Sequence, residues 1–363
     1  MEDKEIDKIY ELIESGEYET AKTVITEVIE KDSEDMEARK LLALCEVNLE
    51  NYDFARVILE DVIKYKQDDA LVWYYLGCCY DNLNDLIAAK HAYLQVLELR
   101  PEYIDAYKSL AIVYIKSEKF DEAIEAGKKA LEISGDDYSL YYILGTASMA
   151  GNHFEKSVEY IEKAIELNPE NLQLYNNLGT SYLTIGNFDK AIETYNKALE
   201  IDDKDSLTYF NIASILQIQE KHKEACEYFA KAHELEPEED NYIVAWALSE
   251  IKAGMFRESV EHYKYLASSY PQKPTYKYNL ACCYQVLGEF EIAISLLKQL
   301  IMMNPKNANY LKKLANIYMT TGQFANAKEI YERIIKQGSV NPQTYYELSL
   351  LCVKTNDLDR AEQ

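Results

Sequence analysis

The chain has 363 residues, a formal net charge of −25, 48% hydrophobic and 28% charged residues, and only 12 Gly and 7 Pro. This composition is typical of a folded globular chain and excludes the disordered and collagen-like classes. The strong acidity disfavours nucleic-acid binding, which needs a basic surface. No apolar run is long enough to span a bilayer and the charged opening is unlike a signal peptide, so we expect a cytoplasmic protein without membrane contact.

The sequence repeats with a period of 34 residues from Glu2 onward, without insertion or deletion. Numbering each repeat from position 1 to 34, position 20 is Ala or Ser throughout: Ala21, Ala55, Ala89, Ala123, Ser157, Ala191, Ala225, Ser259, Ala293, Ala327 and Ala361. A fixed period of this length indicates units that bury their apolar faces by stacking on one another. We predict a single array over residues 2–363, with ten complete repeats beginning at 2, 36, 70, 104, 138, 172, 206, 240, 274 and 308, and a truncated eleventh at 342–363.

Each repeat is predicted to form two amphipathic helices. Apolar or small residues at positions 4, 7, 8 and 11 mark the first helix, and those at positions 17, 20, 24 and 27 mark the second. Glycine at position 15 in five repeats indicates the turn between them, because glycine accepts a positive φ. All seven prolines fall at repeat boundaries, where a helix interior is not interrupted.

The third repeat shows the fullest pattern, with Trp73, Leu76, Gly77, Tyr80, Ala89, Tyr93, Val96 and Pro101. The sixth matches it at most of these positions: Tyr175, Leu178, Gly179, Tyr182, Ala191, Tyr195 and Ala198. This pattern resembles the tetratricopeptide repeat over the whole chain. The resemblance implies an all-α fold, a right-handed superhelical α-solenoid of helix-turn-helix repeats.

Two other places along the chain depart from the pattern. Gly127 occupies position 24 of the fourth repeat, where an aromatic residue is usual, and we expect a locally weakened packing contact there. The sequence stops within the second helix of the eleventh repeat, so we expect a longer parent chain.

Signs of catalysis are few. The sequence has no glycine-rich phosphate loop, no catalytic serine elbow and no histidine cluster with metal-ligand spacing. His222 and Cys226 are better explained as a surface histidine beside a core cysteine than as metal ligands. The seven cysteines are best explained as buried free thiols. We therefore expect no enzyme activity in this region and no cofactor.

In repeat solenoids of this kind, ligands usually bind on the concave side, to which the first helices contribute positions 2, 5, 6, 9, 12 and 13. We call these positions the first-helix face. Over the whole chain they hold seven acids and seven lysines, and from the fourth repeat onward two acids and six lysines. The bulk acidity is therefore expected on the outer surface, and the face should favour neutral to acidic segments.

Two patterns on this face each have two interpretations. Position 5 is aromatic in every odd repeat from the third: Tyr74, Tyr142, Phe210, Tyr278 and Tyr346. These rings could bind ligand side chains, or they could record duplication of a two-repeat block. Asn177, Asn211 and Asn279 at position 6 resemble the asparagine ladder in the tetratricopeptide arm of O-linked N-acetylglucosamine transferases, which holds an extended polypeptide. Asparagine is also common there in these repeats generally.

The leading hypothesis is a non-catalytic scaffold that binds an extended protein segment, chiefly through the fourth to tenth repeats. The predicted peptide-binding residues are Lys108, Tyr142, Asn176, Asn177, Phe210, Asn211, Tyr278, Asn279 and Lys312. One alternative is the substrate-recruiting arm of a larger enzyme, such as a glycosyltransferase, whose catalytic domain lies beyond residue 363. The other is a structural subunit of an assembly that uses outer surfaces. Docking of heat-shock chaperones is disfavoured, because Glu347 stands where their clamp needs asparagine. The oligomeric state stays open.

Overall fold

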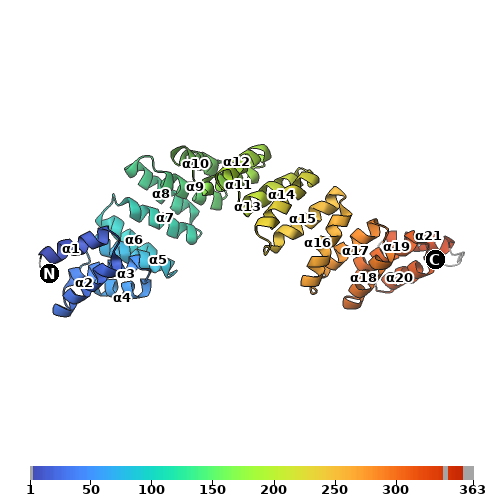
Figure 1. Cartoon of the computed structure of the whole chain (residues 1–363), viewed down its shortest axis with the longest axis horizontal. Helices are drawn as coiled ribbons and strands as arrows, with labels where there is room; N and C mark the ends of the chain where they lie inside the picture. Colours follow the sequence, from blue (N-terminus) through green and yellow to red (C-terminus); the bar gives the residue numbers. More distant parts are fainter. Residues whose placement is uncertain (1–2, 338–341, 355–363) are drawn as a thin grey trace. The chain divides into compact units, whose positions relative to one another are not determined.

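The computed structural model describes residues 3–337 and 342–354, and residues 355–363 of the predicted eleventh repeat lie outside this part. Its regular structure is entirely α-helical, and the helices follow one another as helix-turn-helix pairs in an all-α repeat solenoid (Figure 1). The helices are α1 (Asp3–Glu14), α2 (Tyr18–Lys31), α3 (Met36–Asn48), α4 (Tyr52–Val62), α5 (Ala70–Asn82), α6 (Leu86–Leu99), α7 (Ile104–Lys116), α8 (Phe120–Ser134), α9 (Tyr138–Ala150), α10 (Phe154–Leu167), α11 (Leu172–Thr184), α12 (Phe188–Ile201), α13 (Ser206–Ile218), α14 (His222–Leu235), α15 (Asp240–Ala253), α16 (Phe256–Ser269), α17 (Pro274–Val286), α18 (Phe290–Met303), α19 (Ala308–Thr320), α20 (Phe324–Lys336) and α21 (Pro342–Lys354).

The helix boundaries keep the period of the sequence. Odd-numbered helices from α3 to α21 begin at position 1 of a repeat, and even-numbered helices from α2 to α20 begin at position 17. Acidic or amide side chains before several first helices, such as Asp35 before α3, accept hydrogen bonds from the first free backbone N–H groups. Within the described residues, no helix is both long and apolar enough to cross a membrane.

The turn inside each of the ten complete repeats has a left-handed residue at position 15. Five repeats place glycine there, as the sequence predicts, with φ between 75° and 80°. The other five use Glu50, Asn84, Glu118, Asn152 and Glu220, with φ between 57° and 62°. The turn closes by a backbone bond such as Asn187 N–H to the carbonyl of Tyr182, at 2.9 Å, which satisfies a free carbonyl at the helix end.

The two helices of a repeat approach closely where position 8 meets position 24. At Gly179 an added Cβ would lie 2.6 Å from the buried ring of Tyr195, so only glycine leaves room for this ring. The pair explains why glycine at position 8 accompanies tyrosine at position 24 in the third and sixth repeats.

Gly127 does not mark the weak contact that its position predicts. It is buried, and a Cβ there would lie 2.9 Å from Cδ2 of Leu144, which is itself fully buried. The absent aromatic ring is replaced by a leucine from the next repeat, so the contact is tight. The expectation was wrong because it considered helix propensity and not the neighbouring repeat.

The helices form two compact units, Met1–Asp202 with α1 to α12 and Asp203–Gln363 with α13 to α21. In each unit, helices adjacent in the sequence pack together. In the first unit, α3, α5, α7, α9 and α11 also contact one another in turn, so their first-helix faces lie side by side. The sequence period gives no sign of a division at this point.

Candidate binding face on the first helices

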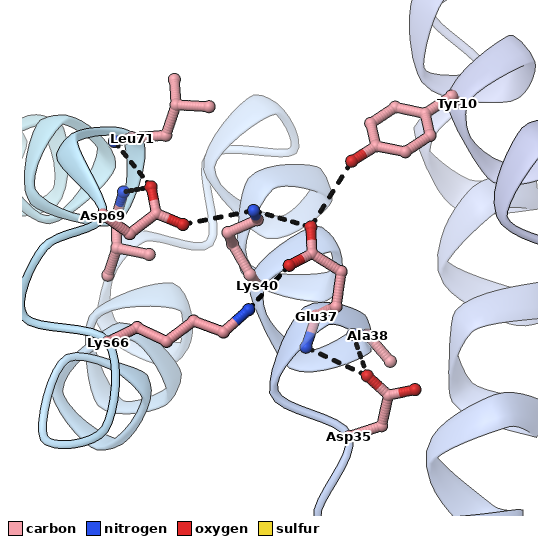
Figure 2. A network of polar contacts seen from close by, with 9 residues as sticks. Tyr10, Asp35, Glu37, Ala38, Lys40, Lys66, Asp69 and Leu71 are labelled. Carbon is pink, nitrogen blue, oxygen red and sulfur yellow. Dashed lines mark hydrogen bonds and ion pairs between the residues drawn. The ribbon is translucent and has the colours of Figure 1, made fainter. Parts of the chain in front are cut away.

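The first-helix face of the second repeat is a network of ion pairs (Figure 2). The ammonium of Lys40 lies 2.6 Å from Glu37 and 3.3 Å from Asp69, and Lys66 lies 2.8 Å from the other oxygen of Glu37. The hydroxyl of Tyr10, from the first repeat, donates to Glu37 at 3.4 Å. Asp69 also accepts bonds from the first backbone N–H groups of α5, so the network joins three consecutive repeats.

This network lowers the pKa of Glu37 and raises the pKa of Lys40. Burial alone would raise the pKa of Glu37, but its bonds to Lys40 and Lys66 hold that pKa below its ordinary value. Burial alone would lower the pKa of Lys40, but its bond to Glu37 and the charge of Asp69 raise it. Both groups are therefore held in their charged forms.

Other lysines on this face of the first unit are paired in the same way. Lys108 lies 2.6 Å from Asp137, and Lys116 lies 2.7 Å from Asp81. Burial acts to raise the pKa of Asp137, but Lys108 and Ser139 hold it below its ordinary value. The ammonium of Lys108, a predicted ligand-selecting group, is thus engaged within the protein.

The first-helix face of the second unit is different. Within the described residues, its four lysines form no ion pair: Lys252, Lys312, Lys313 and Lys354. Its single acid, Glu347, accepts bonds from Tyr331 and from Gln343. Lys312 borders a hollow of about 60 Å³ together with Asn316 and Glu347. This face therefore presents positive charge, on a chain that is acidic as a whole.

The position-5 rings pack mainly within the array. Phe210 lies 5.5 Å from Phe229 and 5.1 Å from Tyr242 of the next repeat, between ring centroids. Tyr278 lies 5.5 Å from Tyr310, also in the next repeat. Tyr142 is half-buried on α9 and has no ring partner among the described residues. For Phe210 and Tyr278, stacking between repeats supports the interpretation that the stripe follows the repeat pattern.

Two of the position-6 asparagines form hydrogen bonds within the protein. The side-chain oxygen of Asn177, which is 9% exposed, accepts a bond from Gln173 at 2.9 Å. The amide of Asn279 donates to the hydroxyl of Tyr263 at 3.0 Å. Asn176 and Asn211 are half-buried on α11 and α13. The structure thus places Lys108, Tyr142, Asn176 and Asn177 in the first unit, and Phe210, Asn211, Tyr278, Asn279 and Lys312 in the second.

The ion pairs were not predicted, although the sequence contains a signal for them. Lysine at position 5 is followed 29 residues later by the aspartate that caps the next first helix, in Lys40 with Asp69 and in Lys108 with Asp137. In the tenth repeat this register holds Asn341, outside the described residues. Lys312 consequently has no aspartate at the corresponding position.

The cysteines are free thiols, and burial raises the pKa of Cys226 to about 12. No group of three His, Cys, Asp or Glu side chains in the described part is arranged to hold a metal ion.

Models of the tetratricopeptide repeat match most of the chain, at residues 12–76, 70–103, 104–137, 139–204, 207–239 and 288–343. The chain therefore belongs to the tetratricopeptide repeat family. Its fold is typical of scaffolds for protein–protein interaction. No curated protein sequence matches it.

Solved structures of the same fold come from several proteins. The C-terminal part of a repeat protein from Cytophaga hutchinsonii is 18% identical, with a TM-score of 0.55 over 66% of this chain and 98% of that one. A tetratricopeptide repeat protein from Parabacteroides merdae is 16% identical, with a TM-score of 0.50 over 68% and 97%. YrrB, described as having an unusual peptide-binding site, is 24% identical, with a TM-score of 0.45 over 52% and 96%.

Proposed function

We propose that this chain is a non-catalytic scaffold that binds an extended, acidic polypeptide segment on the first-helix face of its second unit. The observation behind this proposal is the contrast in charge. Lysines on the first-helix face of the first unit are paired with carboxylates, whereas Lys252, Lys312, Lys313 and Lys354 have no such partner in the described part of the chain.

Lysines without a carboxylate partner, on an acidic protein, favour an acidic binding partner for two reasons. They attract carboxylates or phosphates at short range, and the surrounding negative charge repels acidic segments from other surfaces. Lys312 and Lys313 are half-buried, so a partner carboxylate would meet them in a partly desolvated setting where a charge-assisted bond is stronger.

The predicted residues then have separate tasks. Lys312 attracts the acidic segment. Asn211 and the remaining acceptor of Asn279 offer hydrogen bonds to a peptide backbone, independent of its sequence. Phe210 and Tyr278 shape the face through their stacking between repeats. In the first unit, Tyr142, Asn176 and Asn177 are uncharged, so this part of the first-helix face suits a neutral peptide segment.

Selection from a library of random peptides displayed on phage tests this proposal. Three immobilised proteins are compared: wild type, a first-helix variant with Lys252, Lys312, Lys313 and Lys354 changed to Gln, and an outer variant with Lys223, Lys298, Lys306 and Lys336 changed to Gln. The two variants lose the same charge, and the outer four lysines are exposed and form no ion pair in the described residues. Equal thermal stability of the variants is checked first.

We expect wild type and the outer variant to enrich acidic peptides, and the first-helix variant to lose them. Enrichment of the same peptides by all three proteins would remove the first-helix face as the recognition site. It would favour the alternative in which outer surfaces join the chain to an assembly.

A further inference from the structure

A hollow of about 340 Å³ lies between the second helices α6 and α8, over the first helix α7. It lies away from the first-helix face, because its walls come from positions of the packing stripe and from the second helices. Its walls include the rings of Tyr107 and Tyr114 and the side chain of Leu97. Ala126 occupies position 23, where the next repeat carries Tyr160, and this small side chain leaves the space open.

The rim of the hollow is acidic. Its lining includes three carboxylates, Glu98, Glu122 and Glu125, and one lysine, Lys129. Glu98 accepts a bond from the amide of Gln95 at 2.9 Å, and neither Glu122 nor Glu125 forms an ion pair in the described part of the chain. Burial raises the pKa of the Tyr114 hydroxyl, and the charges of Glu122 and Glu125 raise it further, so both carboxylates act on this ring.

The sixth repeat offers a comparison at the equivalent sequence positions. Tyr182 stands 68 residues after Tyr114, at the same position 11, and Lys190 stands 68 residues after Glu122. The ammonium of Lys190 lies 5.0 Å from the centre of the Tyr182 ring and 3.4 Å from its oxygen, while that hydroxyl donates to Glu162 at 2.5 Å. The Tyr182 ring there contacts the ammonium of an internal lysine. In the fourth repeat the lysine is replaced by a third rim carboxylate.

We propose that the hollow between α6 and α8 binds an arginine or lysine side chain from a basic segment of a partner protein. The aromatic wall receives the cation over its ring, the apolar floor covers the aliphatic stem, and the rim carboxylates supply the opposite charge. A cation placed over an aromatic ring gains about 0.5–2 kcal/mol, depending on desolvation. This site is independent of the first-helix face and selects a partner of opposite charge.

The test uses the full chain and a short fluorescein-labelled peptide of alternating Arg and Ala, with binding followed by fluorescence anisotropy. Glu122→Lys places an ammonium at the position that Lys190 holds in the sixth repeat, and we expect it to weaken peptide binding by about tenfold. The matched control is Glu200→Lys, an exposed glutamate on α12 that forms no ion pair in the described residues. It changes the net charge equally, and we expect less than about a twofold effect.

A second variant, Tyr114→Leu, leaves the charge unchanged and removes the ring. We expect it to weaken binding severalfold, with circular dichroism and the melting temperature confirming that it folds. Equal weakening by Glu122→Lys and Glu200→Lys would show general attraction to an acidic protein and overturn the proposal. The same conclusion would follow if Tyr114→Leu and Glu122→Lys both bound the peptide as tightly as wild type.

Discussion

At the scale of single residues, the left-handed turn at position 15 decides how much strain a repeat contains. Glu118 and Glu220 hold positive φ values of 57° and 61°, although glutamate prefers negative φ. Replacing either with glycine should raise the free energy of unfolding by about 1 kcal/mol, because the strain of the left-handed conformation disappears. Urea denaturation followed by circular dichroism measures the change.

The control for this prediction is the same substitution inside a helix. Glu159 is exposed in the middle of α10, where glycine should lower the stability by roughly 0.5 kcal/mol. If Glu118→Gly also lowered the denaturation midpoint, strain in the turn would not be limiting its stability.

Gly127 gives a prediction in the opposite direction from helix propensity. Alanine favours a helix by about 1 kcal/mol over glycine, but its Cβ would overlap the buried Leu144. We expect Gly127→Ala to destabilise the protein by about 1–2 kcal/mol, since the surrounding core cannot expand freely. Combining it with Leu144→Val should recover part of the loss. A denaturation midpoint higher than that of wild type would contradict the tight contact.

At the scale of helices, the ion-pair network around Glu37 makes the stability of the first three repeats depend on pH. Its folded pKa lies below its ordinary value, so the stabilisation is present above about pH 4.3, the unfolded value, and is lost as the pH falls through the folded pKa. At neutral pH we expect Glu37→Gln to cost no more than about 1 kcal/mol, because the network is partly exposed.

Denaturation of wild type and Glu37→Gln between neutral and acidic pH measures this coupling. The difference between their midpoints should shrink as the solution becomes acidic. Glu30→Gln, at an exposed glutamate of α2 without an ion pair in the described residues, should show no such trend. A difference independent of pH would mean that Glu37 acts through packing and not through its charge.

At the scale of the whole molecule, the sequence predicts the helices better than their surfaces. From α2 to α21, the helices begin at positions 1 and 17 of the repeats. Each helix needs apolar side chains at helical spacing, and the strict 34-residue period makes this spacing easy to recognise in the sequence. The pairing of Lys108 with Asp137 depends on contact between consecutive repeats, and counting charges along one helix does not reveal it. The hollow over Tyr114 likewise depends on the small size of Ala126 relative to Tyr160 at the same position of the next repeat. The boundary at Asp202 and Asp203 has no counterpart in the repeat pattern.

The most direct test of the scaffold hypothesis is affinity purification from native extract with quantitative mass spectrometry. It compares wild type, the variant with Lys252, Lys312, Lys313 and Lys354 changed to Gln, and the outer variant with equal loss of charge. We predict that acidic partners captured by wild type remain with the outer variant and fall severalfold with the first-helix variant. The same partners in equal amounts on all three proteins would contradict recognition through the first-helix face.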